Sequence, residues 1–212
     1  MYNSKNVTVS LILLALSMMK IVLINPPFII TKKKAFSFQC LGLLYIASFL
    51  RIKGHEIKII DAFSLGNNNF KNINKEYYKA GLDNNKIIKR IEPDVDLIGI
   101  SVPFSHLARI VHELVFDIKA FIPKVPVVLG GVYPSTQPEL AIKSNADFIV
   151  MGDGEETILN IADYISGKTN QLLNGIITSN SDNENPKSHF TNDINILPFP
   201  ARDLLPAHVT QI

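Results

Sequence analysis

The most constraining feature of this 212-residue chain is an alternation of short apolar segments with helical patterns. Five segments are apolar on both faces of a strand, at residues 21–25, 56–61, 96–102, 125–129 and 147–151. Helical patterns lie between and after them, at residues 41–52, 84–91, 107–121, 138–145 and 155–166. Strands buried on both faces that alternate with helices form a parallel sheet covered on both sides.

The number of these units predicts the fold. We expect an α/β fold with a doubly wound (flavodoxin-like, Rossmann-type) parallel sheet of five strands in the order 2-1-3-4-5. Residues 175–179 predict an appended edge strand, with residues 188–191 as its candidate partner. Two prolines, Pro26 and Pro27, stop the first strand. The Asn-rich stretch 67–74 predicts a mobile polar loop.

The two ends of the chain differ from this pattern. The apolar run 7–19 would span about 20 Å as a helix, short of the roughly 30 Å hydrocarbon core of a membrane. Because a strand begins at Met19, we favour an N-terminal extension at 1–18 over a signal or membrane anchor and over a packed helix, and we expect a cytoplasmic protein. Residues 19–191 form one domain, and the Pro-rich stretch 192–212 is a linker.

Composition excludes several functions. The chain has 21 Lys and Arg against 19 Asp and Glu, a balance that disfavours a nucleic-acid binder. It has one cysteine, Cys40, so it cannot form an internal disulfide, an all-cysteine zinc site or an iron–sulfur cluster. Redox or radical chemistry would therefore need a group that this chain does not supply.

The loops after the strands predict where a ligand binds. In a doubly wound sheet, ligands bind outside the carboxyl ends of the strands. The glycine-containing loops after the fourth and fifth strands, 130–134 and 151–157, converge on that edge with the ends of the first three strands. A pair such as Gly130-Gly131 admits close approach of a ligand to the backbone, although a tight turn is the alternative interpretation.

The chemistry of these loops argues against a phosphate. Gly152-Asp153-Gly154 resembles the opening of a phosphate loop, but Asp153 and the two following glutamates would repel an anion. Glu155 and Glu156 either complement the helix dipole or bond hydroxyl or amide groups of a flat, bulky ligand admitted by the glycines. The loop after the first strand has no glycine, which disfavours a Rossmann dinucleotide site and a P-loop.

Several other side chains have two interpretations. Ser101 donates to a ligand or caps a turn, and Phe104 and Tyr133 flank a planar ring or pack at the rim. The five histidines show no metal spacing, and we interpret His106 as a solvated residue at a helix start. Cys40 is a packing residue rather than a nucleophile. Lys32–Lys34 is a solvated loop or, as the alternative, a docking patch. No catalytic set is defined by spacing.

The order of the motifs resembles the N-terminal cobalamin-binding domain of B12-dependent radical SAM proteins. The resemblance extends over about residues 19–206. Its motifs are KIVLINPP (20–27), LGLLYIA (41–47), GHE (54–56), IID (59–61), IGIS (98–101), VLGG (128–131), GDGEET (152–157) and LPFPARDLLP (197–206).

The resemblance implies a cobalamin whose corrin ring lies over the strand ends. The regions of Ser101 and Gly130-Gly131 would line it, and the loop 152–157 would contact the ring or the nucleotide tail. The Asp-x-His-x-x-Gly motif that ligates cobalt is absent, which implies base-off cobalamin without a histidine ligand. The implied cofactor-binding residues are Pro26, Gln39, Asp61, Ser101, Val102, Phe104, Gly130, Gly131, Tyr133, Met151, Gly152, Gly154, Glu155 and Thr157.

Two positions depart from the family pattern, since Gln39-Cys40 replaces a proline and Asp153 stands where Glu is common. The cysteine triplet for the [4Fe-4S] cluster that activates S-adenosylmethionine is also absent. The resemblance therefore implies a cobalamin-binding module that works with a radical SAM barrel in cis or in trans and is not catalytic alone. A truncated front of a complete radical SAM methyltransferase and a cofactor-free interaction domain are the alternatives.

Overall fold

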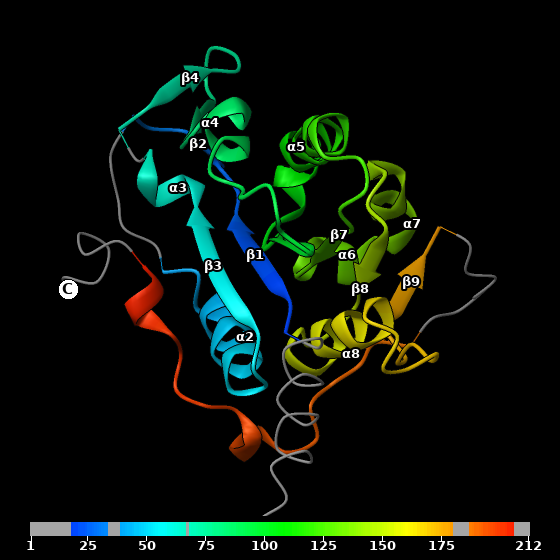
Figure 1. Ribbon diagram of the computed structural model, residues 1–212. Coiled ribbons are helices and arrows are strands. Elements are labelled where there is room, and N and C mark those ends of the chain that lie inside the picture. Colours follow the sequence, from blue (N-terminus) through cyan, green and yellow to red (C-terminus); the bar gives the residue numbers. More distant parts are fainter. Residues whose placement is uncertain (1–17, 34–38, 67, 180–186, 206–212) are drawn as a thin grey trace, which may run out of the picture.

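The main sheet of the molecule has six strands. The computed structural model describes residues 18–33, 39–66, 68–179 and 187–205 (Figure 1). The strands lie in the order β3-β1-β6-β7-β8-β9. Their bounds are β1 (Lys20–Asn25), β3 (Glu56–Asp61), β6 (Leu97–Ser101), β7 (Val127–Gly130), β8 (Phe148–Val150) and β9 (Ile176–Thr178). In the centre, Leu23 of β1 pairs with Ile59 on one side and Gly99 on the other.

The strand order agrees with the sequence prediction. Counted along the chain, the five parallel strands lie in the order 2-1-3-4-5, and β9 is the appended edge strand. Because β9 runs antiparallel to β8, the sheet is mostly parallel but mixed. The expected pairing of β9 with residues 188–191 is wrong, since His189 forms a bridge with Gly152 instead. The N–H of His189 donates to the carbonyl of Met151, which directs this segment to the loop after β8.

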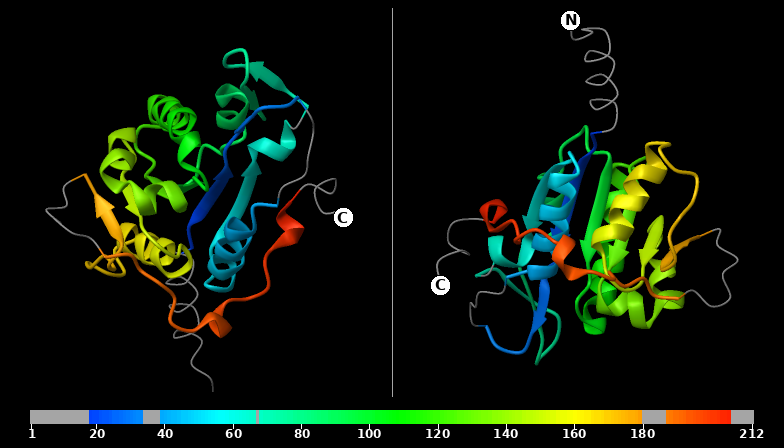
Figure 2. Two further views of the ribbon diagram at one scale, coloured as in Figure 1. Left: turned by 180° about the vertical axis from the view of Figure 1, so that it is seen from behind. Right: turned by 90° about the horizontal axis from the view of Figure 1, so that it is seen from below.

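Helices cover both faces of the sheet (Figures 1 and 2). Successive residues of β1 alternate between two apolar clusters, because side chains of a strand point to opposite faces. Val22 and Ile24 pack with the cluster on one face, whereas Ile21 and Leu23 pack with the other. The first face carries α4 (Asn84–Ile88), α5 (Ala108–Phe121), α6 (Val132–Thr136) and α7 (Pro138–Ala141), and the second carries α2 (Leu41–Ile52) and α8 (Glu155–Ile165).

A second, smaller sheet corrects one sequence expectation. It is antiparallel, in the order β2-β5-β4, and lies beyond the carboxyl ends of β1 and β3 (Figure 1). Its strands are β2 (Phe28–Ile30), β4 (Phe70–Asn72) and β5 (Tyr78–Ala80). The Asn-rich stretch therefore contains a strand and is not wholly a loop, and the chain becomes extended again after the two prolines. Phe28 is buried against Phe63 of α3 (Ala62–Leu65), with 4.6 Å between ring centroids.

The described part of the expected linker packs on the domain. It contains two short 3-10 helices, Ile194–Ile196 and Arg202–Leu204, and crosses α8 and α2 on their outer side (Figure 2). The N–H of Ala201 donates to the carbonyl of Leu44 in α2. The rest of that stretch, 206–212, and residues 1–17 of the expected extension lie outside the described residues. Among the described residues, none of the helices is long and apolar enough to cross a membrane.

Candidate functional site

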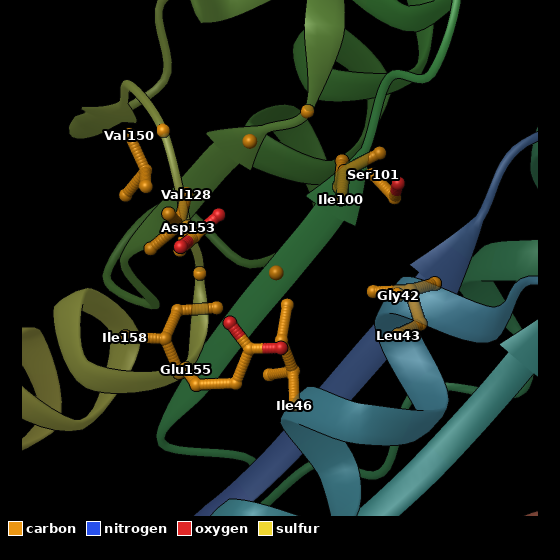
Figure 3. Close-up of a pocket in the computed structure, with 15 residues that line it drawn as sticks. Gly42, Leu43, Ile46, Ile100, Ser101, Val128, Val150, Asp153, Glu155 and Ile158 are labelled. Carbon is orange, nitrogen blue, oxygen red and sulfur yellow. The ribbon is translucent and has the colours of Figure 1, made fainter. Parts of the chain in front are cut away.

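A pocket lies between the N-terminal halves of α2 and α8, on the sheet face that these helices cover (Figure 3). Its volume is about 220 Å³. Leu43 and Ile46 of α2 form one wall, and Ile158 of α8 forms the opposite wall. The rest of the lining is Gly42, Gly99, Ile100, Ser101, Val128, Gly130, Gly131, Val150, Gly152, Asp153, Gly154 and Glu155. The pocket is therefore mostly apolar and opens at the carboxyl edge of the sheet.

Glycines in the lining create this space. A Cβ on Gly99, in the middle of β6, would lie 2.9 Å from Leu23 and 3.3 Å from Ile158. A side chain there would collide with both residues, so Gly99 allows Leu23 and Ile158 to pack over the strand at the floor of the pocket. Gly42 and Gly130 differ, because no heavy atom lies within 4 Å of a Cβ on Gly42, and a Cβ on Gly130 would meet only Val150, at 3.8 Å. The fold has room for side chains at these two positions, and glycine at each leaves that part of the pocket open.

Two glycines at the rim are required by backbone geometry. Gly131 and Gly152 have φ angles of 107° and 91°, which side chains of L-residues rarely allow. A Cβ on Gly131 would lie 2.9 Å from the carbonyl oxygen of Val102, and one on Gly152 would overlap the carbonyl oxygen of His189. These turns bring the loops after β7 and β8 close to the neighbouring backbone at the rim of the pocket.

The polar groups of the pocket are few. Ser101 supplies a hydroxyl at the end of β6, and Asp153 and Glu155 supply carboxyl groups from the loop and the first turn of α8. Burial raises the pKa of Glu155, and the nearby charges of Asp153 and Glu156 raise it further, against an opposing effect of backbone N–H groups at the helix start. This end of the pocket therefore disfavours anions.

The structure brings together six of the fourteen residues that the sequence suggested for cofactor binding. The pocket is lined by Ser101, Gly130, Gly131, Gly152, Gly154 and Glu155. They come from three strand-end loops that lie far apart in the sequence. Their convergence follows from the parallel sheet, in which the carboxyl ends of β6, β7 and β8 lie at one edge.

The other suggested residues lie around the rim or beneath it. Pro26, Val102 and Met151 are buried at the ends of their strands, and Gln39 is half-buried just before α2. Thr157 is buried and donates to the carbonyl of Asp153. Asp61 is also buried, and its Oδ1 accepts hydrogen bonds from Asn25 Nδ2 at 2.8 Å and from the N–H of Ser64 at 3.0 Å. Asp61 thus caps α3.

The two aromatic residues lie on the far side of the strand ends from the pocket. Tyr133 is 2% exposed, and its hydroxyl is 3.0 Å from His112 Nε2, in the cluster that includes α5. Phe104 is half exposed, makes an edge contact with Phe28 and stacks on His106. Neither residue lines the pocket. Tyr133 is a packing residue, and Phe104 lies at the rim.

Sequence reasoning missed the wall that α2 contributes. Gly42, Leu43 and Ile46 were expected only as parts of a helix, because no strand-end rule applies to a helix. Gly99 was also missed, although it gave a signal. A glycine inside an otherwise β-branched buried strand indicates that something approaches the backbone closely. Asp153 was noted for its charge and as a departure from the family pattern, but not as a pocket residue.

Neither a metal centre nor a reactive thiol is present in the part of the chain that the structure describes. It contains no group of three His, Cys, Asp or Glu side chains that could hold a metal ion. Cys40 is buried at the start of α2, and burial, reinforced by the charge of Asp61, raises the pKa of its thiol to about 12. It stays protonated at neutral pH and is a packing residue.

Fold and site together define an α/β domain with a mostly apolar pocket at the carboxyl edge of its sheet. A comparison with protein families identifies the ligand class. The B12 binding domain family matches residues 29–162, which is more than half of the chain, so the chain belongs to this family. The cobalamin-binding domain named by the sequence resemblance is thereby confirmed.

Comparisons with individual proteins cover smaller parts. The chain is 32% identical over 133 residues to cytidylyl-2-hydroxyethylphosphonate methyltransferase of Streptomyces wedmorensis, a match that spans 60% of this chain and 24% of the relative. A solved structure of a putative cystathionine beta-lyase involved in aluminum resistance, from Listeria monocytogenes, is 13% identical, with a TM-score of 0.37 over 72% of this chain and 41% of that one.

Proposed function

We propose that this chain is the cobalamin-binding module of a B12-dependent radical SAM system of the methyltransferase type. The observation that supports this proposal best is the glycine-floored pocket between α2 and α8, at the carboxyl edge of a domain of the B12-binding family. The open space at Gly42 and Gly130 fits a bound ligand, because a side chain at either position would project into it.

The size of the pocket suggests which part of the cofactor enters it. A volume of about 220 Å³ is far too small for a corrin ring but suits the flat heterocyclic base of its nucleotide tail. In this arrangement the apolar walls of α2 and α8 would hold the base. The turns at Gly131 and Gly152, at the rim of the pocket, would contact the corrin ring. Six of the residues implied by the resemblance would then contact the cofactor directly.

The described histidines favour base-off binding without a protein ligand to cobalt. His106 is the histidine nearest in sequence to the rim, and its ring stacks on Phe104 rather than lining the pocket. His189 lies beside the loop after β8, but its Nε2 is 2.9 Å from Glu156 Oε2. With the base held between α2 and α8, no nitrogen ligand from this chain is proposed for the lower face of cobalt.

The residues of the chain position the cofactor and exclude water from its tail. When bound, cobalamin supplies a cobalt centre for methyl transfer or radical chemistry. Leu43, Ile46 and Ile158 would shield the base, and Ser101 would offer a hydroxyl to its polar edge. Such positioning leaves the exposed face of the ring free for a partner that performs the reaction.

That partner is proposed from the family and the relative. A radical SAM barrel, in cis or in trans, would carry the [4Fe-4S] cluster and S-adenosylmethionine, and the chain spans about a quarter of the methyltransferase that it matches. A cytoplasmic location and a truncated front of a complete methyltransferase are compatible with this proposal. A cofactor-free interaction domain is less well supported, because the strand-end edge contains an open pocket.

Calorimetric titration with two corrinoids tests the proposal. Cobalamin and cobinamide, which lacks the nucleotide tail, should both bind, and cobinamide should bind more weakly because it leaves the pocket empty. Loss of a well-buried aromatic base predicts a decrease of at least about tenfold in affinity. Equal affinities would refute the assignment of the tail to the pocket, and no binding of either corrinoid would favour the cofactor-free alternative.

A further inference from the structure

The charged groups of the pocket are of one sign. Among its described lining residues, only Asp153 and Glu155 carry charge, and both are acids. The α2 wall contributes Gly42, Leu43 and Ile46, and the strands contribute Ser101 and apolar or glycine residues. The portion of a ligand that enters must therefore be neutral or able to take up a proton, because an anion would find no positive charge here.

Glu155 differs from its neighbour Glu156 in where it points. Glu155 is the first residue of α8 and is half-buried, and its carboxyl group extends toward Ile46 of α2 across the pocket (Figure 3). Glu156 lies outside the lining, and its carboxylate contacts His189. Of these two adjacent acids, only Glu155 lines the pocket.

We propose that Glu155 selects corrinoids whose nucleotide base contains a basic ring nitrogen, by sharing one proton with that nitrogen. The inference rests on the proposed function. A base that has left cobalt exposes the lone pair of its ring nitrogen, which requires a hydrogen-bond donor once it is buried. The carboxyl group of Glu155 supplies that donor when it takes up one proton from solvent, and the proton returns to solvent on release.

The surroundings of Glu155 raise the pKa of its carboxyl group; burial has the largest effect, and backbone N–H groups at the helix start oppose it. Asp153 and Glu156 lie close enough to oppose its ionisation, and the apolar wall of α2 gives it no cation as a partner. A corrinoid with a phenolic base has no ring nitrogen, so Glu155 would gain nothing from binding it. The pocket would then distinguish nitrogen heterocycles from phenols by one hydrogen bond, which corresponds to about tenfold in affinity.

Calorimetry in buffers with different heats of protonation tests the inference between about pH 6 and pH 8. Cobalamin should bind with net uptake of up to one proton at the upper end of this range, and a phenolyl cobamide should bind without it. Glu155→Gln should retain cobalamin affinity, since its amide can donate, but lose the proton uptake. Glu155→Leu should weaken cobalamin about tenfold while leaving the phenolyl cobamide unchanged.

Glu156→Gln is the matched control and should keep the proton uptake, because Glu156 faces His189 rather than the pocket. Binding of cobalamin without proton uptake at any pH, or equal uptake with the phenolyl cobamide, would overturn the inference while leaving the proposed function intact. If neither corrinoid binds the wild-type protein, the proposed function itself fails.

Discussion

The backbone N–H of Asp153 donates a hydrogen bond of 2.8 Å to the carbonyl oxygen of His189. This contact fastens the segment at 187–191 to the loop that lines the pocket. Asp153 Oδ2 also accepts from the N–H of Thr191, and His189 contacts Glu156, so the attachment involves several groups. The same segment continues across α8 and α2, the two helices that form the pocket walls (Figure 2).

Replacement of Gly152 should disrupt this attachment. Gly152→Ala combines a positive φ angle with overlap of the new Cβ and the carbonyl of His189, and we expect a loss of about 1–3 kcal/mol in the free energy of unfolding. Chemical denaturation measures it. Gly42→Ala is the control, since the helix start has room for a Cβ and should gain a few tenths of a kcal/mol or more. Equal effects of the two substitutions would contradict the described contact.

A larger side chain at Gly42 should block the pocket without unfolding the domain. No heavy atom lies within 4 Å of a Cβ on Gly42, so the fold has room for the side chain of Gly42→Phe at the pocket wall. We expect this variant to bind cobalamin at least about tenfold more weakly by titration. Leu41→Phe is the matched control, because Leu41 is the neighbouring residue, is 43% exposed and does not line the pocket. Unchanged affinity in the Gly42 variant would show that the tail binds elsewhere.

Acid should destabilise the domain through the buried His55 and the half-buried His112. Burial lowers the pKa of His55 and of His112 below the ordinary value of 6.5. Below that value these histidines bind protons in the unfolded chain more readily than in the folded protein. The free energy of unfolding therefore decreases as the pH falls through and below about 6.5. Denaturation at about pH 7.5 and about pH 5.5 should show lower stability in acid, and His55→Gln should reduce the difference. An unchanged difference in that variant would exclude His55 as a cause.

Asp61 should act mainly on stability. It caps α3 and accepts from Asn25, so Asp61→Ala removes two buried hydrogen bonds and should cost about 2–4 kcal/mol. The folded variant should retain its corrinoid affinity, because Asp61 does not line the pocket. A large loss of affinity with unchanged thermal stability would restore Asp61 as a cofactor-binding residue.

The sequence predicted the main sheet well because most of its strands are apolar on both faces and each long helix has a regular apolar stripe. The bounds of α2 and β3 agree with the predicted ranges 41–52 and 56–61. The small sheet was missed because its strands have three residues each, too few to show a period. Its burial depends on contacts such as Phe28 with Phe63, which are distant in the sequence.

The candidate site was predicted only in part for a similar reason. The strand-end rule identified Ser101, Gly130 and Gly152 because it follows from topology alone. It could not distinguish side chains that face the pocket from those that face the opposite core, which is why Tyr133 was included. The α2 wall depends on how the helix is placed against α8, a packing relationship that no local pattern encodes.

The most direct test of the central claim is retention of corrin by the protein. Protein saturated with hydroxocobalamin should be desalted by gel filtration, and the corrin absorbance of the protein fraction compared with protein concentration. The account predicts about one corrin per chain in the wild-type protein and much less in Gly42→Phe. Absence of corrin from the wild-type fraction, or equal retention by both proteins, would contradict binding at this pocket.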